Sequence, residues 1–92
     1  MGPFQKYITE LFGYDKVILM NSGVEGGETA CKFARRWGYE SKGIPENKAR
    51  IAFAKRNFWG RTIAACASSD DPGRYQGFGP YDLRFDLIDY ND

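Results

Sequence analysis

The spacing of apolar residues predicts two amphipathic helices. From Phe4 to Phe12 apolar side chains recur at i, i+3, i+4, i+7 and i+8, which predicts a helix that Gly13 ends. A second helix is predicted to follow residue 24, with Gly38 as a natural stop. The apolar residues that share one face of this second helix are Ala30, Phe33, Ala34 and Trp37.

Short runs of apolar residues predict buried strands between and after these helices. Val17–Met20 and Arg50–Ala54 are typical of buried strands, and residues 85–90 are the candidate for a final strand. Residues 62–67 indicate the start of a short helix, and residues 68–82 are rich in turn formers. A strand, a helix and a second strand joined by so long a crossover predict parallel strands, and therefore an α/β fold.

The predicted elements are too few for a complete α/β domain. Two or three parallel strands cannot have both faces and both edges covered by the helices available. We therefore expect residues 1–92 to be a partial domain, a slice of a larger, mostly parallel sheet with flanking helices. The end at Asn91-Asp92, which has nothing of a finished terminus, agrees with this expectation.

Charge and composition exclude several classes of function. The 13 basic and 12 acidic residues are well mixed, so nothing favours binding to nucleic acid or to a membrane surface. The chain has no histidine, which excludes a Ser-His-Asp triad and any zinc site containing histidine. Cys31 and Cys66 are too few for a four-thiolate site, so no metal site is predicted. Any chemistry must use a cofactor, carboxylates, lysine, arginine or backbone groups.

The loop between the first predicted strand and the second helix is a candidate anion site. Gly23, Gly26 and Gly27 keep the backbone bare at the positive end of the helix dipole, where phosphate binds readily. The dinucleotide fingerprint fails here because Gly23 is followed by Val24 and Glu25, and the nucleotide P-loop fails because no Gly-Lys-Ser/Thr occurs. Ser22 and Glu25 also match a capping box, so a capped helix after a tight turn is an open alternative.

A second loop, Asn57–Thr62, follows the next predicted strand. Parallel strands bring both loops to the carboxyl edge of the sheet, where open α/β folds bind ligands. An aromatic residue there can stack on a flat heterocycle, and an arginine can grip a carboxylate with its two-pronged guanidinium. Together the two loops predict a pocket for a phosphorylated aromatic cofactor that handles an amino acid.

At this point the chain resembles the class-III aminotransferases, which are pyridoxal-phosphate-dependent enzymes of fold type I. The segments that carry the resemblance are Met20–Glu25, Glu28–Lys32, Ala34–Tyr39, Asn57–Thr62 and Gly77–Pro80. The resemblance runs from about residue 7 to residue 92 but covers only the early part of the family's cofactor-binding large domain. Within the family, Val24 and Trp59 favour the branch that acts on ornithine over the branch that acts on acetylornithine.

The resemblance implies a role for each site residue. The implied cofactor-binding residues are Ser22, Gly23, Val24 and Phe58. The first three hold the phosphate of pyridoxal 5'-phosphate, and Phe58 stacks on its ring. Trp59 walls the substrate side, and Arg61 orients the α-carboxylate of ornithine. Each role has a plainer alternative: an N-cap for Ser22, a core aromatic for Phe58 and a surface arginine at a helix start for Arg61.

The implied reaction transfers the δ-amino group of ornithine to a 2-oxo acid, 2-oxoglutarate, and gives glutamate semialdehyde. It needs a Schiff-base lysine and an acid facing the pyridine nitrogen, both of which the family places downstream of residue 92. No catalytic residue is therefore assigned in this chain, and we expect the chain alone to be inactive. The resemblance also implies an intracellular homodimer of the mitochondrial matrix or cytoplasm. The alternatives are another ω-aminotransferase, such as the acetylornithine enzyme, or a non-catalytic remnant acting as a binding module.

Overall fold

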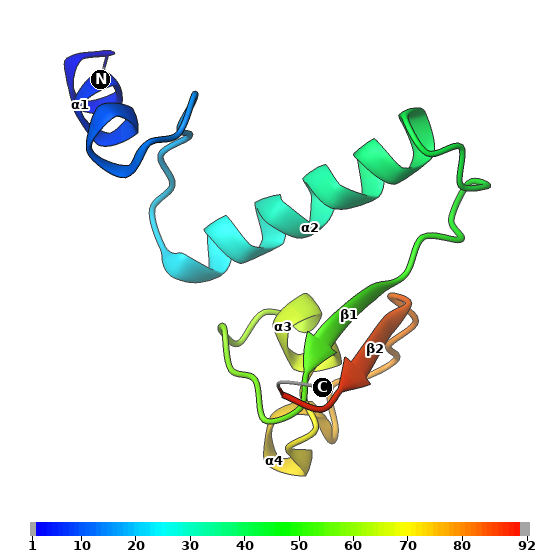
Figure 1. Cartoon of the computed structure of the whole chain (residues 1–92). Coiled ribbons are helices and arrows are strands. Elements are labelled where there is room, and N and C mark those ends of the chain that lie inside the picture. Colours follow the sequence, from blue (N-terminus) through cyan, green and yellow to red (C-terminus); the bar gives the residue numbers. More distant parts are fainter. Residues whose placement is uncertain (1, 91–92) are drawn as a thin grey trace.

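The computed structural model describes residues 2–90, which form four helices and a two-stranded sheet (Figure 1). The elements are α1 (Gly2–Phe12), α2 (Gly23–Glu40), β1 (Ile51–Ala54), α3 (Ile63–Ala67), α4 (Pro72–Tyr75) and β2 (Phe85–Ile88). The two strands pair in parallel, with Ile51 opposite Phe85 and Ala54 opposite Ile88. The predicted α/β class is confirmed, as are the strands predicted at residues 50–54 and 85–90.

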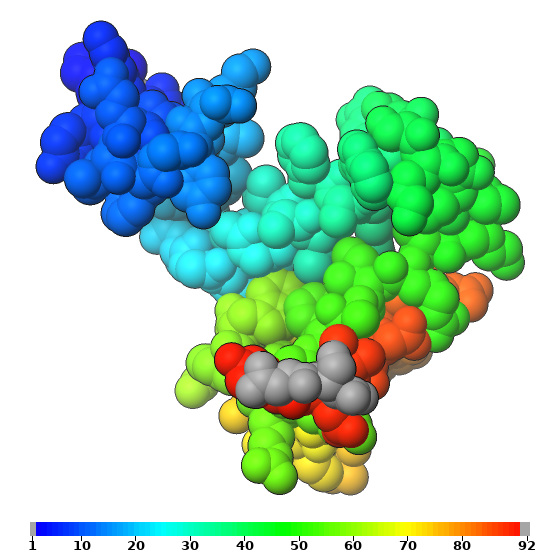
Figure 2. Space-filling view, in the orientation of Figure 1, coloured from blue at the N-terminus to red at the C-terminus, as the bar shows by residue number. Residues whose placement is uncertain are grey.

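Helix α1 forms where the apolar spacing predicts it. It ends at Phe12, and Gly13 follows with a φ of +77° while its N–H donates to the Thr9 carbonyl oxygen at 2.9 Å. No residue of α1 is buried. The helix stands apart from the sheet (Figures 1 and 2), and Gln5 links it to the next segment by donating to the Val17 carbonyl oxygen at 3.4 Å.

The strand predicted at Val17–Met20 is wrong for the structure as described. These residues adopt no regular secondary structure, and Ile18 is 65% exposed. A strand needs a neighbour that completes its backbone hydrogen bonds, and within residues 2–90 the sheet contains only β1 and β2. None of the four residues is buried, because no strand partner for them is present within residues 2–90.

The end predicted for α2 at Gly38 is also wrong, because the helix continues to Glu40. Gly38 is buried, and a Cβ at this position would lie 3.1 Å from Cδ1 of Ile44. The glycine thus lets the chain after α2 fold back closely over the helix. The helix is closed instead by Ser41, whose N–H donates to the Trp37 carbonyl oxygen at 2.8 Å.

Helix α2 packs on the rest of the structure through small residues and one arginine, not through its apolar stripe. Gly27 meets Trp59, and Arg35 donates to the Leu83 carbonyl oxygen. Its guanidinium also lies 5.3 Å from the centre of the Phe85 ring. On the stripe, by contrast, Phe33 is 69% exposed. The apolar face predicted for this helix therefore lies at the surface of the described structure.

The buried core is small and lies around α3 and the end of β1. The buried residues there are Ala65, Cys66, Ser68 and Ser69, while Ala49 before β1 and Gly38 on α2 are buried elsewhere. The ring of Phe53 lies 5.5 Å from that of Trp59 and 5.0 Å from that of Phe85. The radius of gyration is 15.5 Å, whereas about 12 Å is typical of a compact domain of this length. None of the helices described for residues 2–90 is both long and apolar enough to cross a membrane.

Candidate functional site

The start of α2 presents backbone donors that could hold an anion. Ser22 is the N-cap, and its Oγ accepts from the Glu25 N–H at 3.4 Å while its hydroxyl lies 3.1 Å from the Glu25 carboxylate. The N–H groups of Gly23 and Val24 occupy the first helical positions, which have no acceptor within the helix. With the helix dipole behind them, these two donors form a site that fits an anion.

The loop between β1 and α3, residues 55–62, is anchored at both ends. The Asn57 side-chain amide donates to the carbonyl oxygens of Ala54 at 2.9 Å and Ser68 at 2.7 Å. At the other end Thr62 is the N-cap of α3, and its Oγ1 accepts from the Ala65 N–H at 3.2 Å. The residues predicted to face a ligand are thus carried by a loop of fixed shape.

Gly60 brings this loop against the start of α2. Its φ is +150°, and a Cβ at this position would lie 2.3 Å from Cγ2 of Val24. Only glycine satisfies both the backbone conformation and the close approach. The structure therefore places Val24, from the predicted phosphate loop, directly beside the second predicted loop.

Trp59 points inward, between α2 and the sheet. Its ring is stacked on Phe53 with an interplanar angle of 4°, and its Nε1 donates to the Ser68 Oγ at 2.7 Å. A Cβ on Gly27 would lie 2.5 Å from Cε3 of the indole, so the glycine makes room for the tryptophan. These contacts are all with protein groups, and the role of Trp59 as a substrate wall stays a prediction.

Phe58 and Arg61 lie on the other side of the loop and share a cavity of about 660 Å³. The residues lining this cavity are Phe58, Arg61, Ile63, Cys66, Asp71, Gly73, Arg74 and Phe78. Phe58 is 58% exposed, and the Arg61 side chain is exposed beside it. An aromatic ring and a guanidinium thus meet in one hollow, which suits a flat ligand that carries a carboxylate.

The described residues do not gather every predicted site residue into one pocket. Ser22 and Gly23 are absent from the lining of the cavity that holds Phe58 and Arg61. Contact between the two halves of the site runs through Val24 and Gly60. The structure therefore shows two adjoining half-sites, one of backbone donors and one of side chains.

Arg74 is a residue that sequence reasoning missed. It lies on α4, and its guanidinium carbon is 4.7 Å from the centre of the Phe58 ring. The available signal was Asp71-Pro72, a helix-capping residue followed by a proline suited to the first helical turn. Because residues 68–82 were interpreted as turns, this short helix and its arginine were not placed.

Each half-site has one carboxylate beside it: the Ser22 hydroxyl lies 3.1 Å from that of Glu25, and Asp71 lines the cavity. Burial raises the pKa of the Cys31 thiol, against the opposing effect of Arg35, so the thiol is a poorer nucleophile than an ordinary cysteine. No cluster of three metal-ligating side chains occurs in the part of the chain that the structure describes. The arrangement of an aromatic ring, guanidinium groups and backbone donors can bind and orient a ligand.

Comparison with known proteins gives a consistent result. Residues 1–92 match the family model described as aminotransferase class-III. The chain is 60% identical to the mitochondrial ornithine aminotransferase of Rattus norvegicus and 59% identical to that of Drosophila ananassae. Both matches cover 100% of this chain and 21% of the relative, so the chain spans about a fifth of their length.

A solved structure agrees with this result. The ornithine aminotransferase of Toxoplasma gondii superposes with a TM-score of 0.96 at 50% identity, over 99% of this chain and 22% of that one. That structure is described as having partial occupancy of PLP, pyridoxal 5'-phosphate, at its active site. The fold of this segment is therefore that of the corresponding part of the Toxoplasma enzyme.

Proposed function

The chain belongs to the class-III aminotransferase family, and we propose that it is part of an ornithine aminotransferase. This enzyme would transfer the δ-amino group of ornithine to 2-oxoglutarate and give glutamate semialdehyde. The observation that carries the proposal is the identity of 59% and 60% with two ornithine aminotransferases, which extends over the whole chain. The agreement of Val24 and Trp59 with the ornithine branch supports the same assignment.

The donor set at the start of α2 fits the phosphate of pyridoxal 5'-phosphate. The N–H groups of Gly23 and Val24 would hold it, with the Ser22 hydroxyl nearby, and Phe58 would stack on the pyridine ring. When bound, the cofactor supplies an electron sink for cleavage of the C–H bond beside the reacting nitrogen. The contribution of these residues is to fix the position and plane of that sink.

Arg61 would set which end of ornithine reacts. Its exposed guanidinium lines the cavity beside Phe58 and would grip the α-carboxylate. Holding the carboxylate at a distance leaves the δ-nitrogen, rather than the α-nitrogen, at the reactive position. Trp59 would support this geometry by fixing the loop between Phe58 and Arg61 to the sheet.

The remaining chemistry would come from residues outside this chain. We propose that residues 1–92 are part of the cofactor-binding large domain, and that the lysine that binds the cofactor lies further along a longer protein. The 92 residues alone would then not transaminate. A homodimer, and residence in the mitochondrial matrix or cytoplasm, belong to the same proposal. The two mitochondrial relatives support the first of these compartments.

The test is a substrate panel on the full-length protein that carries this sequence. We expect bound pyridoxal phosphate and faster formation of glutamate semialdehyde from ornithine than turnover of acetylornithine. Arg61→Met should raise the KM for ornithine about 100-fold, since one partner of a charge pair is lost. Arg36→Met, at an exposed arginine paired with Glu40 at 2.8 Å, is the matched control and should leave KM unchanged. Preference for acetylornithine, or absence of the cofactor, would overturn the proposal.

A further inference from the structure

We propose that Arg74 is a positioning residue that fixes the plane of the Phe58 ring, and through it the cofactor ring. The inference rests on the proposed function, because it assigns to Phe58 the stacking role described above. Arg74 would not touch the substrate or the reacting atoms. It would act by holding Phe58 in one orientation before the cofactor arrives.

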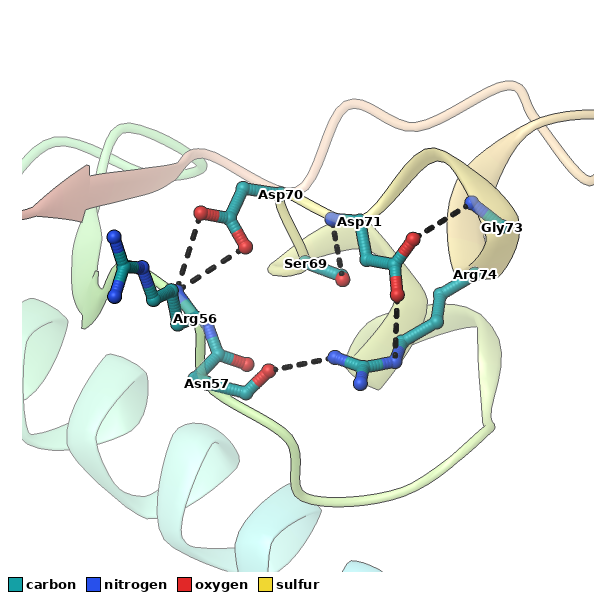
Figure 3. A network of polar contacts seen from close by, with 7 residues as sticks. All are labelled: Arg56, Asn57, Ser69, Asp70, Asp71, Gly73 and Arg74. Atoms are coloured by element: carbon teal, nitrogen blue, oxygen red, sulfur yellow. Dashed lines mark hydrogen bonds and ion pairs between the residues drawn. The ribbon is translucent and has the colours of Figure 1, made fainter.

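Three contacts hold the Arg74 guanidinium, and Figure 3 shows the two polar ones. Its Nη1 donates to the Asn57 carbonyl oxygen at 2.9 Å, and its Nε lies 3.7 Å from the Asp71 carboxylate. The third contact is the face of the Phe58 ring, 4.7 Å from the guanidinium carbon to the ring centre. A planar guanidinium tied through two of its nitrogens has a defined plane, so it offers the ring a fixed surface.

The support beneath Arg74 is itself tied to buried residues. Asp71 caps α4 by accepting from the Gly73 N–H at 3.0 Å, and its own N–H donates to the Ser69 Oγ at 3.0 Å. Ser69 is 8% exposed. Beside it, the Asp70 carboxylate accepts from the Arg56 N–H with both oxygens at 3.1 Å. These bonds join a four-residue helix, too short to be stable by itself, to the loop that carries Phe58.

Phe58 needs such a support because it is exposed. An aromatic side chain at 58% exposure is free to change rotamer unless a neighbour restrains it. The guanidinium lies over one face of the ring, so in this proposal the cofactor ring would stack on the other. Ordering Phe58 in advance removes part of the cost of ordering it when a ligand binds. The expected consequence is slower loss of the cofactor and a single orientation of its ring.

The experiment uses the full-length protein loaded with pyridoxal phosphate. The variants are Arg74→Met, Arg74→Lys, Phe58→Ala and the double variant Phe58→Ala with Arg74→Met, with Arg36→Met as the control. Two readouts follow the cofactor: its rate of loss, from visible absorbance, and its visible circular dichroism, which reports ring orientation. We expect about tenfold faster loss and altered dichroism in Arg74→Met, an intermediate value in Arg74→Lys, and no change in the control.

The double variant separates positioning from general stability. If Arg74 acts through Phe58, Arg74→Met should add nothing to Phe58→Ala. The inference would be overturned if Arg74→Met kept the cofactor as long as the wild type does. It would also be overturned if Arg74→Met accelerated cofactor loss as much in the Phe58→Ala background as in the wild type. Either result would leave the proposed function intact. A wild-type protein that binds no pyridoxal phosphate would overturn both. If Arg74→Met does not fold, Arg74→Lys with and without Phe58→Ala decides the question by the same criteria.

Discussion

Residues 51–75 and residues 2–40 differ in what holds them in place. In the first region, aromatic stacking and side-chain hydrogen bonds tie β1, the β1–α3 loop, α3 and α4 together, and most of the buried residues lie there. In the second region the helices form by local spacing and capping, but apolar side chains of the helices and of the segment between them remain at the surface. Leu11, Ile18 and Phe33 are 57%, 65% and 69% exposed.

The difference shows which parts of the chain find their packing and hydrogen-bond partners within residues 2–90. The loop with Phe58 and Arg61 finds its supports within some 20 residues, in Ser68, Asp71 and Arg74. The stripe on α2 and the Val17–Met20 run have the sequence of buried elements but no cover within residues 2–90. Because large exposed apolar patches mark contact surfaces, this half is where the rest of a longer protein would pack.

The largest expected effect tests the exposed half. Phe33→Ala in the full-length protein should lower the free energy of unfolding by at least about 2 kcal/mol, because a covered phenylalanine leaves a cavity when truncated. Chemical denaturation measures it. Lys32→Ala, at the neighbouring position, should stay within about 0.5 kcal/mol. A Phe33→Ala effect as small as that of Lys32→Ala would mean that the stripe faces solvent in the complete protein.

A smaller effect is expected from crowding the contact between the two halves. Gly27→Ala would place a Cβ 2.5 Å from the Trp59 ring, and the resulting shift should cost about 1–3 kcal/mol in the same unfolding experiment. A Cβ on Gly26 would meet nothing within 4 Å, so Gly26→Ala should be neutral or stabilise the helix by up to about 1 kcal/mol. Equal behaviour of the two variants would contradict the packing of Trp59 on α2.

The smallest effect concerns an ion pair at the pairing of β1 with β2, next to the well-packed region, and depends on pH. Hydrogen bonding from Arg50, with Nε 2.9 Å from the Asp86 carboxylate, lowers the pKa of Asp86. A carboxyl whose pKa is depressed on folding adds stability above its unfolded pKa of about 3.9, and loses it as pH falls through the folded value. The free energy of unfolding, measured from pH 5 downward, should fall in the wild type. In Asp86→Asn it should fall less, because the contribution of Asp86 is missing. Parallel pH curves for variant and wild type would refute this expectation.

Elements determined by near neighbours were predictable from the sequence. Apolar spacing placed α1, Gly13 marked its end, and Thr62 was correctly placed at the start of α3. The sequence pattern did not show which residues, distant in the chain, pack against each face of a helix. Gly38 resembles a helix stop, but Ile44 packs against it, and the apolar stripe of α2 is not the face that meets the sheet.

The candidate site divides in the same way. Ser22 beside Gly23 correctly indicated the capped start of α2, and the loop after β1 does lie beside it; binding of an anion there stays a prediction. The inward turn of Trp59 depends on space left by Gly27, which is distant in sequence. Arg74 depends on a four-residue helix whose only sequence signal is its cap.

The parallel pairing of β1 with β2 also has a consequence during synthesis. Residues 55–84 separate the two strands, so the ribosome must make them before β1 can pair with β2. At about 5–20 residues per second this delay lasts a few seconds. Throughout it, β1 is a nascent strand without its neighbour, while α2 has already been made. Once Trp59 has been made, its ring can stack on Phe53 of β1 and pack against Gly27 of α2, so part of the strand gains cover before β2 emerges.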